Sequence, residues 1–259
     1  MSKREEFLRA EKFAIYYGKG ALDRLIQFDV VIIEPGHRTA EEIEVLKLHG
    51  TLVLAYVSVM EIHQEHPLRS YVKEDLYLRE ANPPYGFLIQ KEYQNRIVGM
   101  DSSNWRGLLL HHIGRLITRE GYDGVFLDTI GDVEISNIPN PMRQVDGAKT
   151  FVELIRSTFP NHVIVQNNGL EILCNYTAPY LDGIAWENPP LEIKESKQWV
   201  KLIAERLVRL KKHYPLRVIT LFEGKRQENR FAFLRGRSFA QEHGFTAYFS
   251  PNHYLDFHM

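Results

Sequence analysis

The chain has 259 residues, 25% of them charged, and a formal net charge of −1. This balance excludes the strongly basic surface that nucleic acids or anionic membranes attract, so we expect neither as a partner. No apolar stretch is long enough to cross a membrane, and a single cysteine, Cys174, rules out an internal disulfide bond.

Eight short apolar segments bounded by turn residues predict eight strands that are buried on both faces. In chain order they cover residues 13–17, 30–33, 52–58, 124–127, 162–166, 183–186, 217–222 and 245–249. Helical patterns separate most of them. Thr39 and Glu42 form a capping box, and apolar stripes at helical spacing run over residues 105–117 and 199–210.

Strands that alternate with helices predict parallel pairing through right-handed crossovers. Eight such units in a chain of about 250 residues match a single (β/α)8 TIM barrel, so we predict one α/β domain over residues 1–259. An open doubly wound sheet is the alternative, but no G-x-G-x-x-G motif follows the first strand. The charged N-terminus lacks the apolar core of a signal peptide. We therefore expect the chain as given to be cytoplasmic, or secreted if a leader has been removed.

One connection is far longer than a single helix requires. After the third strand, residues 61–104 form an excursion that carries Tyr71, Tyr77, Tyr85, Phe87 and Tyr93. Long loops on a compact domain are often functional, and aromatic loops at a barrel mouth suit sugar rings. A small satellite core beneath the excursion is an equally good interpretation.

One sequence motif occurs twice and suggests a catalytic pair of carboxylates. Residues 123–128 and 182–187 both begin with Asp-Gly, continue through apolar residues and stop on a carboxylate, and residues 29–34 form a looser third copy. The C-terminal ends of barrel strands are where a TIM barrel places its chemistry. Because alternate residues of a strand share a face, Asp128 and Glu187 are both expected to point toward the barrel axis.

Two facing carboxylates are the groups that glycoside hydrolysis needs. One protonates the leaving oxygen, and the other attacks the sugar or activates water. A single acid at a strand end more often caps a helix or pairs with arginine. A matched pair among five acids favours catalysis, and these acids are Glu34, Glu61, Asp128, Glu187 and Glu223.

Further polar and aromatic side chains close or follow the strands and could contact sugars. The predicted substrate-binding residues are Tyr16, Glu34, Tyr56, Glu61, Gln166, Asn167, Asn168, Trp186, Glu223, Tyr248 and Asn252. No histidine pattern has zinc spacing, and no lysine ends a strand, so we predict neither a metal site nor a cofactor. The expected partner is a polysaccharide or oligosaccharide substrate.

Three segments resemble a known family. Residues 30–35 (VVIIEP), 54–61 (LAYVSVME) and 121–129 (GYDGVFLDT) are similar to the endo-α-1,4-polygalactosaminidase family, glycoside hydrolase family 114. The resemblance implies a (β/α)8 barrel that cleaves α-1,4-linked galactosamine or N-acetylgalactosamine polymers. It also implies that Asp128 is the nucleophile and Glu187 the acid/base. These roles favour retention, and the separation of the two carboxylates decides the outcome, since a distance of about 5 Å indicates retention and a wider one inversion.

The sequence departs from the family pattern at two positions of the expected site. Met60 stands where the family usually has the glycine of Val-Gly-Glu, and Gly131 stands where an aspartate is frequent. A catalytically inactive, glycan-binding barrel therefore remains an alternative function. A phosphosugar enzyme that uses Lys225 and Arg226 is another, although no glycine-rich phosphate loop accompanies them.

The acids at the predicted mouth also favour one class of glycan. Partly deacetylated aminosugar polymers are cationic, and carboxylates around a cleft would attract them and repel anionic glycans.

Overall fold

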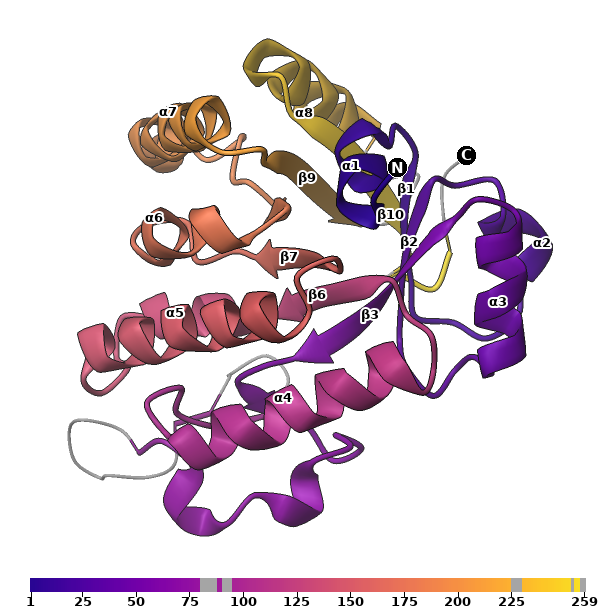
Figure 1. Ribbon diagram of the computed structural model, residues 1–259. Coiled ribbons are helices and arrows are strands. Elements are labelled where there is room, and N and C mark those ends of the chain that lie inside the picture. The colour runs from indigo at the N-terminus through magenta and orange to yellow at the C-terminus, as the bar shows by residue number, and fades with distance from the viewer. Residues whose placement is uncertain (80–87, 90–94, 225–229, 253, 257–259) are drawn as a thin grey trace.

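The computed structural model describes residues 1–79, 88–89, 95–224, 230–252 and 254–256 of the chain. Its centre is one sheet of eight parallel strands with helices around the outside (Figure 1). The strands, in sheet order, are β1 (Phe13–Tyr16), β2 (Val30–Ile33), β3 (Leu52–Ser58), β6 (Gly124–Asp128), β7 (Val163–Asn167), β8 (Gly183–Glu187), β9 (Arg217–Gly224) and β10 (Thr246–Pro251).

The two end strands of this sheet lie side by side. The Tyr248 hydroxyl of β10 donates to the Ile15 carbonyl of β1 at 3.4 Å, which joins the two ends of the sheet. The sheet therefore curls into a nearly closed barrel. This is the (β/α)8 TIM barrel that the sequence predicts, with a strand in each of the eight predicted segments.

Helices cover the outside of the barrel, and α1 lies across its N-terminal end. They are α1 (Lys3–Arg9), α2 (Leu22–Leu25), α3 (Ala40–Leu48), α4 (Ser103–Thr118), α5 (Pro141–Thr158), α6 (Leu173–Thr177), α7 (Lys197–His213) and α8 (Arg230–His243). Within the described residues, no helix is both long enough and apolar enough to span a bilayer.

The predicted helix signals have their expected geometry. The Thr39 hydroxyl accepts a hydrogen bond from the Glu42 backbone, and the Glu42 side chain accepts one from the Thr39 backbone, which completes the capping box of α3. In α4, the Ser102 hydroxyl caps the helix, and the residues of the apolar stripe from Trp105 to Ile117 turn inward. Packing of such stripes against the strands forms the core between the two layers.

The aspartates that begin the two repeats form ion pairs and hydrogen bonds at the N-terminal end of the barrel. Asp123 pairs with Lys3 at 2.8 Å and accepts the Val53 amide of the neighbouring strand at 3.0 Å. Asp182 pairs with Arg4 at 2.7 Å and with Arg156 at 2.6 Å. Each repeat therefore begins with a buried aspartate that ties strands to each other and to helices.

The glycine after each aspartate allows close packing. A Cβ atom on Gly124 would lie 2.1 Å from the Val163 carbonyl oxygen, and one on Gly183 would lie 2.9 Å from the Phe7 ring. Phe7 is fully buried and carries the apolar contact of α1 with the barrel. A larger residue than glycine at either position would push these elements apart.

The excursion after β3 forms a short antiparallel pair, β4 (Glu61–Ile62) with β5 (Arg96–Ile97), and two 3-10 turns. Leu68, Leu88 and Val98 are buried beneath it. Its described part is therefore a satellite core, one of the two interpretations that the sequence allows. Tyr85, Phe87 and Tyr93 lie outside the described residues.

Candidate active site

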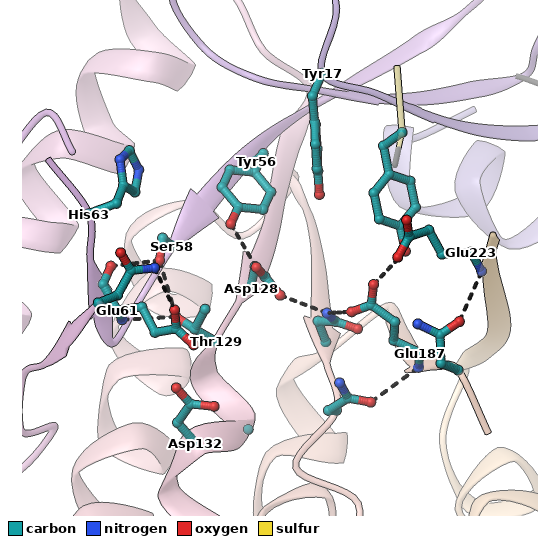
Figure 2. Close-up of a pocket in the computed structure, with 16 residues that line it drawn as sticks. Tyr17, Tyr56, Ser58, Glu61, His63, Asp128, Thr129, Asp132, Glu187 and Glu223 are labelled. Carbon is teal, nitrogen blue, oxygen red and sulfur yellow. Dashed lines mark hydrogen bonds between the residues drawn. The ribbon is translucent and has the colours of Figure 1, made fainter. Parts of the chain in front are cut away.

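A cavity of about 1000 Å³ lies at the C-terminal ends of the strands (Figure 2). It is lined by Tyr17, Tyr56, Ser58, Glu61, His63, Asn95, Asp128, Thr129, Gly131, Asp132, Asn167, Asn168, Glu187, Asn188, Glu223 and Tyr254. Five of these residues are acidic, and none of the described residues that line the cavity is a lysine or an arginine. The cavity therefore has the chemistry of a site for a polar and preferably cationic ligand.

Asp128 ends β6, Glu187 ends β8, and one amide on the intervening strand joins them. The Asn167 side-chain nitrogen donates to Asp128 Oδ1 at 2.7 Å and to Glu187 Oε2 at 2.9 Å. These two oxygens can therefore be no further apart than 2.7 plus 2.9 Å, which is 5.6 Å. Carboxyl groups of retaining glycosidases are about 5–5.5 Å apart, whereas those of inverting enzymes are about 6.5–9.5 Å apart.

Two tyrosines hold the remaining oxygens of this pair. The Tyr56 hydroxyl donates to Asp128 Oδ2 at 2.7 Å, and the Tyr254 hydroxyl donates to Glu187 Oε1. The side chain of Asn168 accepts the backbone amide of Glu187 at 3.1 Å. Both carboxylates are therefore fixed in orientation before any substrate binds, as electrostatic preorganisation requires.

The two carboxyl groups differ in their surroundings. Burial raises the pKa of Glu187, and the nearby negative charge of Asp128 raises it further. The hydrogen bonds from Tyr254 and Asn167 act in the opposite direction and lower this pKa in part. The net rise favours a protonated Glu187 beside a carboxylate, which is the division of roles that a general acid and a nucleophile need.

A third tyrosine stands between these two groups. Figure 2 shows Tyr17 with its hydroxyl pointing toward the space between Asp128 and Glu187. Its ring packs edge-on against Tyr56 at a centroid distance of 5.0 Å and lies 5.1 Å from the ring of Tyr254. Burial and the surrounding carboxylates raise the pKa of Tyr17 well above its ordinary value, so its hydroxyl keeps its proton. It is a donor available to substrate.

A second pair of acids, Glu61 and Asp132, lies on the side of Asp128 that is away from Glu187 (Figure 2). The Asn95 amide donates to Glu61 at 2.8 Å, and Asp132 faces Glu61 in the same part of the cavity (Figure 2). Burial and the charges of Glu61 and Asp128 raise the pKa of Asp132 to about 8. At neutral pH Asp132 therefore keeps its proton, and a bound cation would displace it.

Thr129 anchors the loop that carries Glu61. Its hydroxyl oxygen accepts the backbone amides of Val59 at 3.0 Å, Met60 at 2.8 Å and Glu61 at 3.2 Å. Thr129 itself has a left-handed backbone with φ of 57°, which is uncommon for a β-branched residue. This strained turn places Asp128 and Glu61 in one cavity.

The structure brings seven of the sequence-predicted site residues to the cavity. They are Tyr56, Glu61, Asp128, Asn167, Asn168, Glu187 and Glu223. Their common property is that they end or directly follow strands, so the parallel sheet gathers them at one end.

Six predicted substrate-binding residues do not line this cavity. Tyr16 is buried away from the cavity lining and donates to the Lys19 carbonyl at 3.0 Å, and its neighbour Tyr17 lines the cavity. Tyr248 is buried against β1, and Asn252 is exposed. The Gln166 amide is taken up by the Asn168 carbonyl at 2.7 Å and the Thr177 hydroxyl at 2.7 Å.

The other two of these six lie close to the cavity without lining it. Glu34 is partly buried, and burial together with the charge of Asp128 raises its pKa to about 7. Trp186 is buried outside the barrel wall, with its ring 5.8 Å from that of Trp199. Glu34 therefore acts on the cavity through its charge, and Trp186 through packing.

Sequence reasoning missed several residues of the site, notably Tyr17, Tyr254, Asp132, Asn95 and Thr129. Tyr17 and Asp132 could have been found, because Tyr17 directly follows a strand and Asp132 lies four residues after Asp128. Tyr254 and Asn95 carry no comparable signal, since each lies in a loop whose path depends on tertiary contacts.

Metal chemistry and phosphosugar chemistry can be compared with the described residues. In that part of the chain, no group of three or more histidine, cysteine, aspartate or glutamate side chains is placed to hold a metal ion. Lys225 and Arg226, the residues of the phosphosugar alternative, lie outside the described residues.

Three solved structures share the fold. The glycoside hydrolase domain of PelA from Pseudomonas aeruginosa matches with a TM-score of 0.77 at 18% identity, over 95% of this chain and 97% of that one. Aspergillus fumigatus Ega3, in complex with galactosamine, matches with a TM-score of 0.71 at 15% identity, over 95% and 92% of the two chains. An α-galactosidase from Thermus thermophilus matches with a TM-score of 0.62 at 13% identity, over 94% and 61%.

At these identities the structural likenesses establish the fold alone. Comparison with curated proteins finds no match to this chain. The family model for glycoside hydrolase family GH114, in contrast, matches residues 2–201, which include β1 to β8 and both carboxylates of the pair. The chain therefore belongs to glycoside hydrolase family 114.

Proposed function

We propose that this glycoside hydrolase is a retaining, endo-acting enzyme that cleaves α-1,4-linked galactosamine or N-acetylgalactosamine polysaccharide. The observation that carries the proposal is the Asn167 amide shared by Asp128 and Glu187, which limits two of their oxygens to a separation of 5.6 Å (2.7 plus 2.9). This limit supports a retaining mechanism, because inverting enzymes hold their carboxyl groups about 6.5–9.5 Å apart to make room for a water molecule.

In the proposed reaction Asp128 is the nucleophile and Glu187 the acid/base. Asp128 attacks the anomeric carbon while Glu187 transfers its proton to the leaving oxygen, and the shortened chain departs. Glu187 then takes a proton from water, whose oxygen attacks the same carbon and breaks the ester to Asp128. Hydrogen bonds from Tyr56 and Asn167 fix the attacking carboxylate throughout.

The substrate class rests on the charge of the cavity. Glu61, Asp132 and Glu223 surround the catalytic pair, and acids in this number would attract the ammonium groups of galactosamine. Ega3, whose fold this chain shares, has been solved with galactosamine bound. Both points support an aminosugar substrate in preference to a neutral or anionic one.

The test is hydrolysis of α- and β-linked hexosaminoglycans, partly deacetylated and fully acetylated, by the wild-type protein and by Asp128→Asn and Glu187→Gln. We expect an α-1,4-galactosamine polymer to be cut internally, with retention at the anomeric carbon. Each variant should lose activity by at least about a thousandfold. Its unfolding temperature should stay at or above that of the wild type, because Asp128→Asn removes a charge that neighbouring acids repel and Glu187→Gln replaces an acid whose charged form burial disfavours. Internal cleavage will appear as intermediate chain lengths early in the reaction.

Other outcomes have defined meanings. Activity that persists in Asp128→Asn would assign the nucleophile to another carboxylate. A folded wild-type protein that binds glycans without cleaving any would instead establish the glycan-binding barrel.

A further inference from the structure

A second, smaller cavity lies beside the catalytic one. It has a volume of about 300 Å³ and shares Gly131, Asn168, Glu187 and Asn188 with the catalytic cavity. Asp128 does not line it. The side cavity, as we name it, therefore continues the site on the side of the proposed acid and away from the proposed nucleophile.

An aromatic ring with a fixed orientation forms one wall of the side cavity. Trp199, near the start of α7, is partly buried, and its ring packs edge-on against Trp186 at 5.8 Å and 80°. Its indole nitrogen donates to Glu171 Oε1 at 2.8 Å. Packing on one side and a hydrogen bond on the other hold this ring before any ligand arrives, so stacking on it costs little side-chain entropy.

The loop that carries Glu171 is itself held in place. The Glu134 carboxylate accepts the backbone amides of Glu171 at 2.9 Å, Ile172 at 2.8 Å and Leu173 at 2.7 Å. Glu134 lies in η3 (Ile130–Glu134), directly after β6. The wall of the side cavity is therefore tied to the strand that carries Asp128, so the two cavities keep a fixed relation to each other.

We propose that the side cavity binds the sugar on the leaving-group side of the scissile bond, with Trp199 as the surface on which that sugar stacks. The face of an aromatic ring carries partial negative charge and attracts the C–H bonds of a sugar face. The acid protonates the oxygen that belongs to the leaving sugar, so the space beyond Glu187 is where that sugar lies. Glu171 adds a negative charge that complements an ammonium group. This inference rests on the proposed function.

The test compares a substrate that has a sugar on the leaving side with one that has none. An α-1,4-galactosamine oligomer has a sugar on the leaving side, whereas the α-fluoride of the same aminosugar has none. For Trp199→Leu we expect kcat/KM to fall about tenfold with the oligomer and to stay within about twofold with the fluoride. Trp199→Phe, which keeps an aromatic face, should retain most of the oligomer activity.

Two further variants keep the result interpretable. Leu202 is exposed on the same helix and does not line the side cavity, so Leu202→Ala should leave both substrates unchanged. Should Trp199→Leu fail to fold, Glu171→Gln tests the same cavity from an exposed position. Its oligomer activity should fall about two- to fivefold and its fluoride activity should stay the same.

The possible failures are distinct. A wild-type protein that cleaves neither substrate would refute the proposed function, and the leaving-sugar assignment with it. An active wild type whose Trp199→Leu and Glu171→Gln variants lose nothing, or lose equally on both substrates, would refute the side cavity alone.

Discussion

Tyr254 shows how one hydroxyl can set the working pH of the site. It donates to Glu187, and this hydrogen bond lowers the pKa of a carboxyl group that burial and Asp128 raise. Tyr254→Phe removes the donor, so the pKa of Glu187 should rise further. Because Glu187 must be protonated to act as the acid, the alkaline limb of the kcat/KM profile should move to higher pH.

The control for this prediction is Tyr248→Phe. The Tyr248 hydroxyl donates to the Ile15 carbonyl outside the cavity, so its removal should leave the pH profile in place. A profile that Tyr254→Phe leaves unmoved, or moves to lower pH, would show that Tyr254 does not act on the catalytic acid.

Asp132 gives a prediction about stability. Its pKa is about 8 in the folded protein, raised by burial and by Glu61 and Asp128, against an ordinary value of 3.8. Between these two values the folded chain keeps a proton that the unfolded chain has lost, so the free energy of unfolding falls as pH rises through this range. Asp132→Asn should therefore weaken the loss of stability between about pH 5 and pH 8.

Urea unfolding at a series of pH values measures this effect. Asp146→Asn is the matched control, because Asp146 is an exposed acid on α5 whose removal should leave the pH dependence unchanged. Identical slopes for wild type and Asp132→Asn would show that Asp132 titrates in its ordinary range.

At the scale of elements, β6 and β7 lie too close together at Gly124 to admit a side chain. A Cβ atom at Gly124 would approach the Val163 carbonyl to 2.1 Å, and a backbone atom has no rotamer by which to move away. We expect Gly124→Ala to lower the free energy of unfolding by roughly 3 kcal/mol.

Gly107 offers the opposite case on α4. A Cβ atom there meets nothing within 4 Å, and the residue is helical. Gly107→Ala should therefore raise the free energy of unfolding by about 0.5–1 kcal/mol, measured by the same denaturation. Equal effects of the two substitutions would mean that the strands adjust more freely than their spacing allows.

The strands were predictable because burial on both faces leaves an apolar run that turn residues interrupt. Their C-terminal ends extend past that run: β6, β7 and β8 include Asp128, Asn167 and Glu187. The parallel pairing of β3 with β6 also continues into the cavity, where Ser58 lies opposite Asp128. Apolar patterning cannot show this continuation, although the strict alternation of faces still placed both carboxylates correctly.

The site was less predictable where the chain leaves the sheet. Tyr16 and Tyr17 are adjacent and chemically identical, and a one-residue difference decides which of them enters the cavity. Tyr254 reaches Glu187 through a turn in which Asn252 and Tyr254 both have positive φ, of 60° and 59°. Neither asparagine nor tyrosine requires a positive φ, so no local sequence pattern predicts this turn.

At the scale of the whole molecule, the acidic cavity predicts a salt effect. Binding of a partly deacetylated, cationic galactosaminoglycan to Glu187→Gln should weaken several-fold as ionic strength rises from about 0.05 to 0.5 M, because salt screens exposed charges. Binding of the fully acetylated, neutral polymer should change little. Calorimetry with both polymers measures the difference, and equal salt dependence would remove charge as the basis of selectivity.

The motif repeated at residues 123–128 and 182–187 places one acid at each end of the barrel. Asp123 and Asp182 are neutralised by Lys3, Arg4 and Arg156, whereas no described lysine or arginine lines the cavity around Asp128 and Glu187. The net charge of the whole chain is nevertheless only −1. A protein that was acidic over its entire surface would adhere to a cationic polymer mesh wherever it touched and would be immobilised there. If the substrate is the proposed cationic polymer, a nearly neutral barrel with acids gathered at one cavity is expected to diffuse through such a mesh and to be retained mainly where a chain enters that cavity.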